Sequence, residues 1–281
     1  MGPMAEIEVL PPGLSVAEFD DLRLAARCLE GRSFAARAAA LLGRQVEALT
    51  RSLPASLRRL AGRAAETALT GALRVALRTI DPARPPKAAR GAHKVAAAAS
   101  GAIGGAFGLA STAIELPIST TILMRSIIQI AREEGEDPSS PEGALACLEV
   151  FALGDEPGEA AFESGYFAVR GALARSVAES ARYLAGHGVA GVAGEAAPAL
   201  ARLTGQIAAR FGLAVSEKFA AQAVPVIGAI GGAAVNLAFA EHFQTLARGH
   251  FIIRRLERQH GSEAVRLEYR RLTREPDARA S

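Results

Sequence analysis

The hexapeptide Gly-Ala-Ile-Gly-Gly-Ala occurs twice in this chain, at residues 101–106 and 228–233, and it constrains the fold more than any other feature. Each copy lies in a long uncharged segment, residues 95–114 and 219–240. Small residues on one face of a helix let two backbones approach closely. The repeat therefore predicts that the two segments pair as helices at the centre of the fold. The predicted contact residues are Gly101, Gly104, Gly105, Gly108, Gly228, Gly231 and Gly232.

The composition favours helices throughout. Half of the residues are hydrophobic, only 5% are aromatic, and there is no Trp. Ala and Leu dominate, and runs that alternate apolar and polar residues with a period of two are missing. The helical stripe of Leu60, Ala64, Ala68 and Leu77 in residues 55–80 is the clearest amphipathic pattern. We predict an all-α, single multi-helix domain in which amphipathic helices wrap the glycine-rich pair.

Proline, glycine and capping residues divide the chain. Ser15 is an expected helix cap, Pro54 an expected helix start, Pro117 an expected start or kink of a helix over 118–134, and Gly261 a stop. The resulting regions are a flexible leader (1–14), a basic amphipathic helical region (15–80), a linker rich in Pro and basic residues (81–94), a helical core (95–261) and a charged C-terminal helix with its tail (262–281).

The uncharged segments raise the question of membrane insertion. A helix of about 20 apolar residues is long enough to cross a bilayer. The glycines and hydroxyl residues of the first segment, and Gln222, Pro225 and Asn236 in the second, add nothing favourable to insertion. We expect both segments to be packed interior helices of a soluble or peripheral protein, and insertion stays open as the alternative.

Charge is unevenly placed although the net charge is only +3. Residues 22–94 and 248–279 are rich in Lys and Arg, whereas residues 132–164 are rich in Asp and Glu. Basic helices attract anionic lipid, and they can also pair with the acidic middle or simply be solvated. Few aromatic residues are available to stack on bases, so we expect no nucleic-acid partner.

Five polar residues stand where the helical pattern calls for apolar ones: Glu115, Arg125, Glu217, Asn236 and His242. Buried polar groups need partners, so we hypothesise a cluster of Glu115, Arg125, Asn236 and His242. An ion pair that fixes helix register is the structural interpretation, and a catalytic site is the functional one. No metal or cofactor is expected, because no paired carboxylate and histidine signature is present, and His242 and His250 are separated by about 12 Å of helix.

Several segments resemble the EcsC family. They are ELPISTTILMRSIIQIAREEGED (115–137), ACLEVFALG (146–154), ESGYFAVR (163–170), SEKFAAQAVPVIGAIGGAAVN (216–236) and HFQTLARGHFIIRRLE (242–257), so the resemblance covers about Lys94 to Gly261. The family is bacterial and is named after a gene neighbour of an ABC-type transporter. The resemblance implies a helical, membrane-connected protein, and it supplies no catalytic residues.

Together these observations predict a non-enzymatic protein at the cytoplasmic face of the inner membrane. It would be peripheral or partly inserted, and it would bind an anionic membrane surface, a lipid or a membrane protein complex of the ABC-transporter type. The alternative is a soluble cytoplasmic enzyme, most plausibly a hydrolase, that uses Glu115, Arg125 and His242.

Overall fold

Helices are the only regular elements within the residues that the computed structural model describes: 13–31, 33–42, 53–80, 109–154, 165–187, 198–222 and 228–274. The predicted all-α class is therefore confirmed. The helices are α1 (Val16–Leu29), α2 (Phe34–Leu42), α4 (Ala55–Ile80), α6 (Leu109–Glu133), α7 (Pro141–Glu149), the short 3-10 helix η1 (Val150–Ala152), α8 (Gly165–His187), α9 (Pro198–Gln222), α10 (Gly228–His260) and α11 (Ser262–Arg274).

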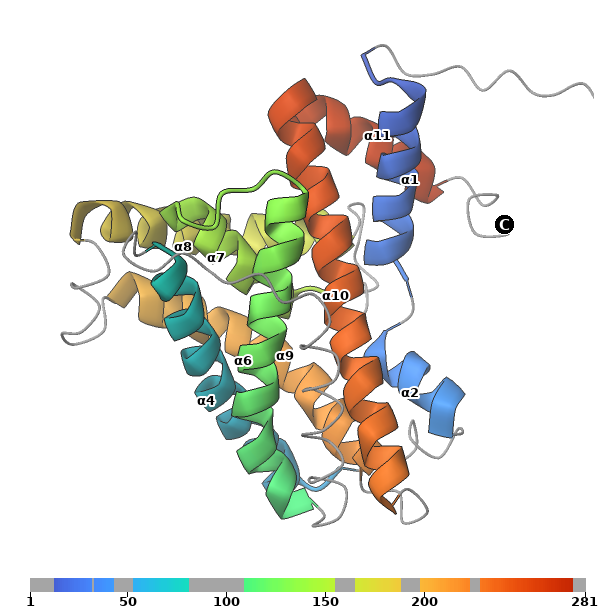
Figure 1. The fold of residues 1–281 in the computed structure, drawn as a ribbon, viewed down its shortest axis with the longest axis vertical. Coiled ribbons are helices and arrows are strands. Elements are labelled where there is room, and N and C mark those ends of the chain that lie inside the picture. Colours follow the sequence, from blue (N-terminus) through green and yellow to red (C-terminus); the bar gives the residue numbers. More distant parts are fainter. Residues whose placement is uncertain are drawn as a thin grey trace, which may run out of the picture.

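The helices α4, α6 and α10 lie side by side, and α9 crosses behind them (Figure 1). The helix α1 packs along the C-terminal half of α10, where α11 also lies, and α7 and α8 pack together near the same end of the molecule. The longest helix, α10, thus contacts α1, α2, α6, α9, η1 and α11. It is the element against which the others are assembled.

One contiguous hydrophobic core joins all the described helices, which confirms a single domain. Phenylalanines fill the place where α2, η1, α9 and α10 meet, with neighbouring ring centroids 5.0–6.0 Å apart. These residues are Phe34, Phe151, Phe211, Phe239 and Phe243. Edge-to-face packing of such rings adds to the free energy of burial. The predicted stripe of α4 also enters this core, since Ala64, Ala68 and Leu77 are buried.

The helix ends follow the local sequence signals. Ser15 forms a capping box with Glu18 at the start of α1, and Ser140 caps α7 by accepting a hydrogen bond from the Gly143 amide. Gly135 has φ +71° just after α6, and the following amide of Glu136 donates to the carbonyl of Ala131. Only glycine adopts this left-handed conformation without strain, so the turn places Glu136 against α10.

Two predicted boundaries are wrong. Residues 219–240 are not one helix, because α9 continues to Gln222 and a new helix begins at Gly228. Residues 223–227, which include Pro225, lie outside the described residues. Pro117 lies inside α6, so the expected helix start at this proline is wrong, and the alternative of a kink stays a prediction. A proline within a helix costs one hydrogen bond, and α6 is long and well packed on both α4 and α10.

The predicted glycine pair lies largely outside the described residues. Gly101, Gly104, Gly105 and Gly108 lie outside the described residues, and of Gly228, Gly231 and Gly232 only the helical backbone of α10 is described. Among the described helices, none combines the length and the apolar composition that crossing a membrane requires.

Close helix contact through a small residue does occur at Gly249, where α10 meets α1. A Cβ atom at this position would lie 2.7 Å from Leu29 Cγ, 2.9 Å from Cys28 Cβ and 3.0 Å from the carbonyl oxygen of Ala25. These atoms belong to the body of α1, so they cannot move aside singly. A side chain at position 249 would push the two helices apart.

We therefore expect Gly249→Ala to destabilise the protein by about 1 to 3 kcal/mol through overpacking. Gly205→Ala is the matched control, because Gly205 also lies inside a helix but a Cβ there would meet nothing within 4 Å. The control should be neutral or stabilising by up to about 1 kcal/mol, since alanine is the better helix former. Urea unfolding of both variants measures the difference, and equal stabilities would refute the close contact.

Candidate functional site

The structure brings together two of the predicted polar residues, Glu115 of α6 and Asn236 of α10, with a third group that was not predicted, Lys218 of α9. Glu115 Oε1 accepts hydrogen bonds from Asn236 Nδ2 at 2.5 Å and from Lys218 Nζ at 3.3 Å. Lys218 is fully buried, and its ammonium also lies 4.9 Å from the ring centroid of Phe239. Burial lowers the pKa of Lys218, and the adjacent carboxylate opposes that shift. The cluster is a closed, buried ion pair that joins three helices.

The other predicted members lie elsewhere. Arg125 is exposed on α6, about 15 Å along the helix from Glu115, so the prediction that it joins the cluster is corrected. Glu217 is half-buried, and its neighbour Lys218 reaches Glu115 instead. His242 is buried between Phe34 and Phe243, and Gly154 packs so close that a Cβ there would lie 2.8 Å from His242 Nε2. Burial and the nearby Arg37 lower the pKa of His242 to about 3, so it is neutral.

The sequence carried a signal for Lys218. Phe211, Val215, Lys218 and Gln222 follow the spacing of one helix face, so a lysine replaces an apolar residue within a buried stripe. Glu217 lies about 100° around the helix from that stripe. A buried lysine needs a carboxylate partner, and Glu115 is the buried acid of α6.

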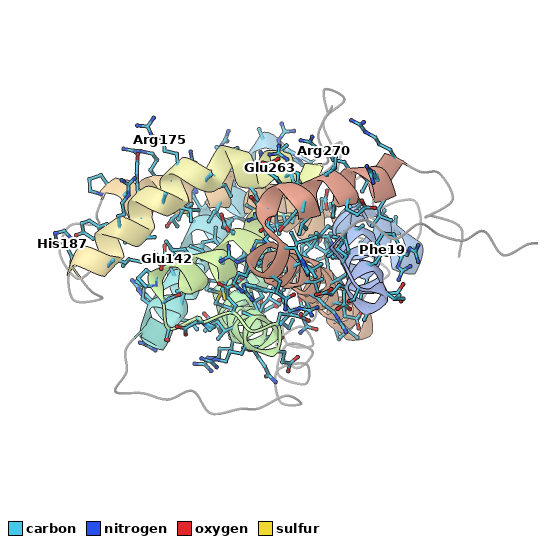
Figure 2. The ribbon with its side chains drawn as sticks, turned by 90° about the horizontal axis from the view of Figure 1, so that it is seen from above. Phe19, Glu142, Arg175, His187, Glu263 and Arg270 are labelled. Atoms are coloured by element: carbon cyan, nitrogen blue, oxygen red, sulfur yellow. The ribbon has the colours of Figure 1, made fainter. Side chains whose placement is uncertain are left out.

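A second group of polar residues surrounds a cleft of about 620 Å³ between α7, α8, α10 and α11. One side of the cleft is the face of α8 formed by Phe167, Gly171, Ala174, Val177, Ala178 and Ala181. Glu142 of α7 and Glu263 of α11, both exposed, stand at its rim (Figure 2). Glu149, the last residue of α7, lies at its buried end.

Glu149 is the carboxylate of the cleft with the most unusual environment. It is only 5% exposed, and this burial raises the pKa of Glu149 to about 7. Arg170 and Arg254 oppose the rise, while Glu257 and Glu136 add to it. Each of the two arginines already has a carboxylate partner: Arg170 donates to Glu257 at 2.8 Å, and Arg254 donates two hydrogen bonds to Glu136 at 2.8 and 2.9 Å. Glu149 therefore keeps its proton to a higher pH than an exposed glutamate does.

A chain of buried groups continues from Glu149 into α10. His250 Nε2 lies 3.9 Å from Glu149 Oε2, and His250 Nδ1 lies 3.0 Å from the hydroxyl of Tyr166. Arg170 donates to that hydroxyl at 3.3 Å, which leaves the Tyr166 proton to be donated to Nδ1. In this arrangement the ring proton of His250 is on Nε2, which lies too far from Glu149 for a hydrogen bond. Burial lowers the pKa of His250 well below its usual value, so the ring is neutral.

The cleft therefore offers a proton donor or acceptor at its end and an apolar surface along α8. This chemistry suits either acid–base transfer or the binding of a charged group. The sequence analysis missed Glu149, because one glutamate near the end of a short helix gives no sign of burial until α8 and α10 cover it. Within the described parts of the chain, no three His, Cys, Asp or Glu residues are grouped so that they could hold a metal ion.

A row of arginines marks the outer face of α4. Arg59, Arg63, Arg74 and Arg78 are exposed and lie within about 100° of one another around the helix. They extend over about 28 Å, with Thr67 and Thr70 between them. We call these four residues the arginine stripe. The opposite face of α4 is buried against α6 and α9, so the stripe is fixed on the surface by the core.

The ion pair of Lys218 and Glu115 can be tested by removing one partner. Lys218→Met leaves a buried carboxylate without its cation, and we expect a loss of about 3 to 5 kcal/mol in the free energy of unfolding. The double variant Lys218→Met with Glu115→Gln should recover most of this loss, because the amide is neutral and can still accept from Asn236. Urea unfolding measures both, and equally unstable single and double variants would contradict the pairing.

The raised pKa of Glu149 predicts a pH-dependent stability. Between pH 4.5 and 7 the unfolded state loses this proton while the folded state keeps it, so the contribution of Glu149 to stability falls as pH rises. We expect Glu149→Gln to gain up to about 3 kcal/mol relative to the unmodified protein between pH 4.5 and pH 8. Urea unfolding at both pH values measures the gain, and exposed Glu142→Gln is the control. A difference that does not change with pH would refute a buried Glu149.

One of the comparisons with known proteins gives a match. A model of the EcsC protein family matches residues 72–256, from the C-terminal part of α4 to near the end of α10. The match contains the buried ion pair and all of the cleft except its α11 side and Glu257. No curated protein and no solved structure shows a significant match. Because the family model covers well over half of the chain, the protein belongs to the EcsC protein family.

Proposed function

We propose that this protein is a non-enzymatic, peripheral membrane protein that binds anionic lipid through the arginine stripe of α4. The observation that carries the proposal is the one-sided placement of Arg59, Arg63, Arg74 and Arg78. Each basic residue close to an anionic membrane surface contributes about 1 kcal/mol. A straight helix can lay all four guanidinium groups against such a surface at once. The inner leaflet of a bacterial membrane is the site that this chemistry fits.

Lipid suits the stripe better than nucleic acid does. The face contains arginines and threonines, with the exposed Glu66 at its edge, and α4 has no aromatic residue that could stack on a base. Single-stranded binding surfaces combine basic and aromatic residues, and α4 lacks the second component. Lipid head groups need only the positive charge and hydrogen-bond donors. A protein that is bound to the membrane through the arginine stripe would also lie next to membrane protein complexes.

The hydrolase alternative finds less support. Arg125 is exposed on α6, and His242 is buried against phenylalanines. Glu115 is enclosed with Lys218 and Asn236 rather than open to a substrate. These positions favour the structural interpretation of the predicted cluster. An enzymatic role would have to use the separate cleft at Glu149.

Vesicle binding tests the proposal. The full chain should sediment with vesicles that contain phosphatidylglycerol and not with pure phosphatidylcholine, and binding should weaken as salt rises. The double variant Arg63→Glu with Arg74→Glu should bind at least about tenfold more weakly, since it removes and reverses two contributions of about 1 kcal/mol each.

The matched control is Arg175→Glu with Arg202→Glu, which makes the same charge change at two exposed arginines beside Glu179 on α8 and α9. It should keep most of the vesicle binding. Equal losses in both variants would show only an effect of net charge and would overturn the stripe. Failure of the unmodified protein to bind anionic vesicles, or stripe-dependent binding of DNA instead, would overturn the proposed function.

A further inference from the structure

The cleft between α7, α8, α10 and α11 has features that lipid binding by α4 does not use. Its wall on α8 is apolar, formed mainly by Phe167, Ala174 and Val177. Its buried end holds Glu149, which is only 5% exposed. At about 620 Å³ the cleft is large enough for a small organic molecule.

The arginines near Glu149 form ion pairs with other carboxylates, so a cation from a ligand could pair with Glu149. On α8 and α10, Arg170 is paired with Glu257, and Arg254 is paired with Glu136, which follows α6. Arg258 also contacts Glu136, but it is 41% exposed to solvent. His250 of α10 is neutral and 3.9 Å away. Arg170 and Arg254 are thus hydrogen-bonded to carboxylates other than Glu149.

We propose that this cleft binds a small molecule that carries a protonated amine on an apolar body. The ammonium group would pair with Glu149, and the apolar body would lie along Phe167, Ala174 and Val177 of α8. An anionic ligand fits less well, because Arg170 and Arg254 already hold carboxylates that it would have to displace. Glu142 and Glu263 at the rim attract a cation toward the opening, whereas Arg182 and Arg266, which also line the cleft, repel it. Glu149 itself therefore has to supply the preference for a cation.

The proposal has a defined pH dependence. The amine pairs with ionised Glu149, and protonation of this group competes with binding. Since the pKa of Glu149 is raised to about 7 by burial, the dissociation constant should rise about tenfold from pH 8 to pH 6. The amine itself stays protonated over this range, so the change reports on the protein. The neighbouring Arg170, Arg254 and Glu136 keep their charges throughout, because the pKa of Glu136 is lowered and those of the two arginines are raised.

Three probes of the same size separate the possibilities: 2-phenylethylamine, 2-phenylethanol and 3-phenylpropionate. Calorimetric titration of the full chain at pH 8 should show the amine binding at least about tenfold more tightly than the alcohol. The reason is that only the amine carries a charge that can pair with ionised Glu149. Glu149→Gln should abolish this preference, whereas Glu263→Gln at the rim should keep most of it. Val177→Trp, which fills the apolar wall, should weaken the amine and the alcohol alike.

Equal binding of the amine and the alcohol would overturn the proposal, and so would tighter binding of 3-phenylpropionate or no binding of any probe. Retention of the amine preference in Glu149→Gln would show that another group anchors it and would equally refute the assignment. Val177→Trp serves as the independent test should Glu149→Gln fail to fold. Vesicle binding is measured separately on α4, so failure here leaves the lipid proposal standing.

Discussion

The buried ion pair between Glu115 and Lys218 is the interaction on which the arrangement of the long helices depends. It joins α6 to α9 and, through Asn236, both of them to α10. A charge in such surroundings is costly without its partner, so a shift of one helix along another would be opposed by a loss of several kcal/mol. Hydrophobic packing alone is less selective, because burial of apolar surface has no preferred direction. The ion pair therefore selects one register among many that apolar packing would accept.

The two proposed binding surfaces differ in exposure and in charge. The arginine stripe stands on the outer face of α4, whose inner face is buried, and its groups are exposed and screened by salt. Glu149, in contrast, is buried, and its charge depends on pH because its pKa is raised. A surface of the first kind suits a large anionic partner with little shape, such as a membrane. An enclosed carboxyl group beside an apolar wall suits a small molecule of defined shape.

Much of the local structure could be predicted from the sequence. Ser15, Ser140, Gly135 and Gly261 lie at helix ends because their side chains or backbone conformations act within a few residues. The amphipathic pattern of α4 likewise identified which residues would be buried. Predictions failed where distant contacts decide: α6 passes through Pro117 while it packs on α4 and α10, and Lys218 rather than Arg125 meets Glu115.

The sequence by itself thus determined the helical class, most helix ends, the basic face of α4 and the presence of buried polar residues at positions 115 and 236, since all of these follow from periodicity and local propensity. Only the tertiary structure decided which groups meet. It placed Lys218 rather than Arg125 beside Glu115, and it enclosed Glu149 with Arg170, Arg254 and His250 from two other helices. Burial and electrostatic pairing depend on groups far apart in the chain, and a one-dimensional pattern shows that a polar residue needs a partner without showing which residue will be near it.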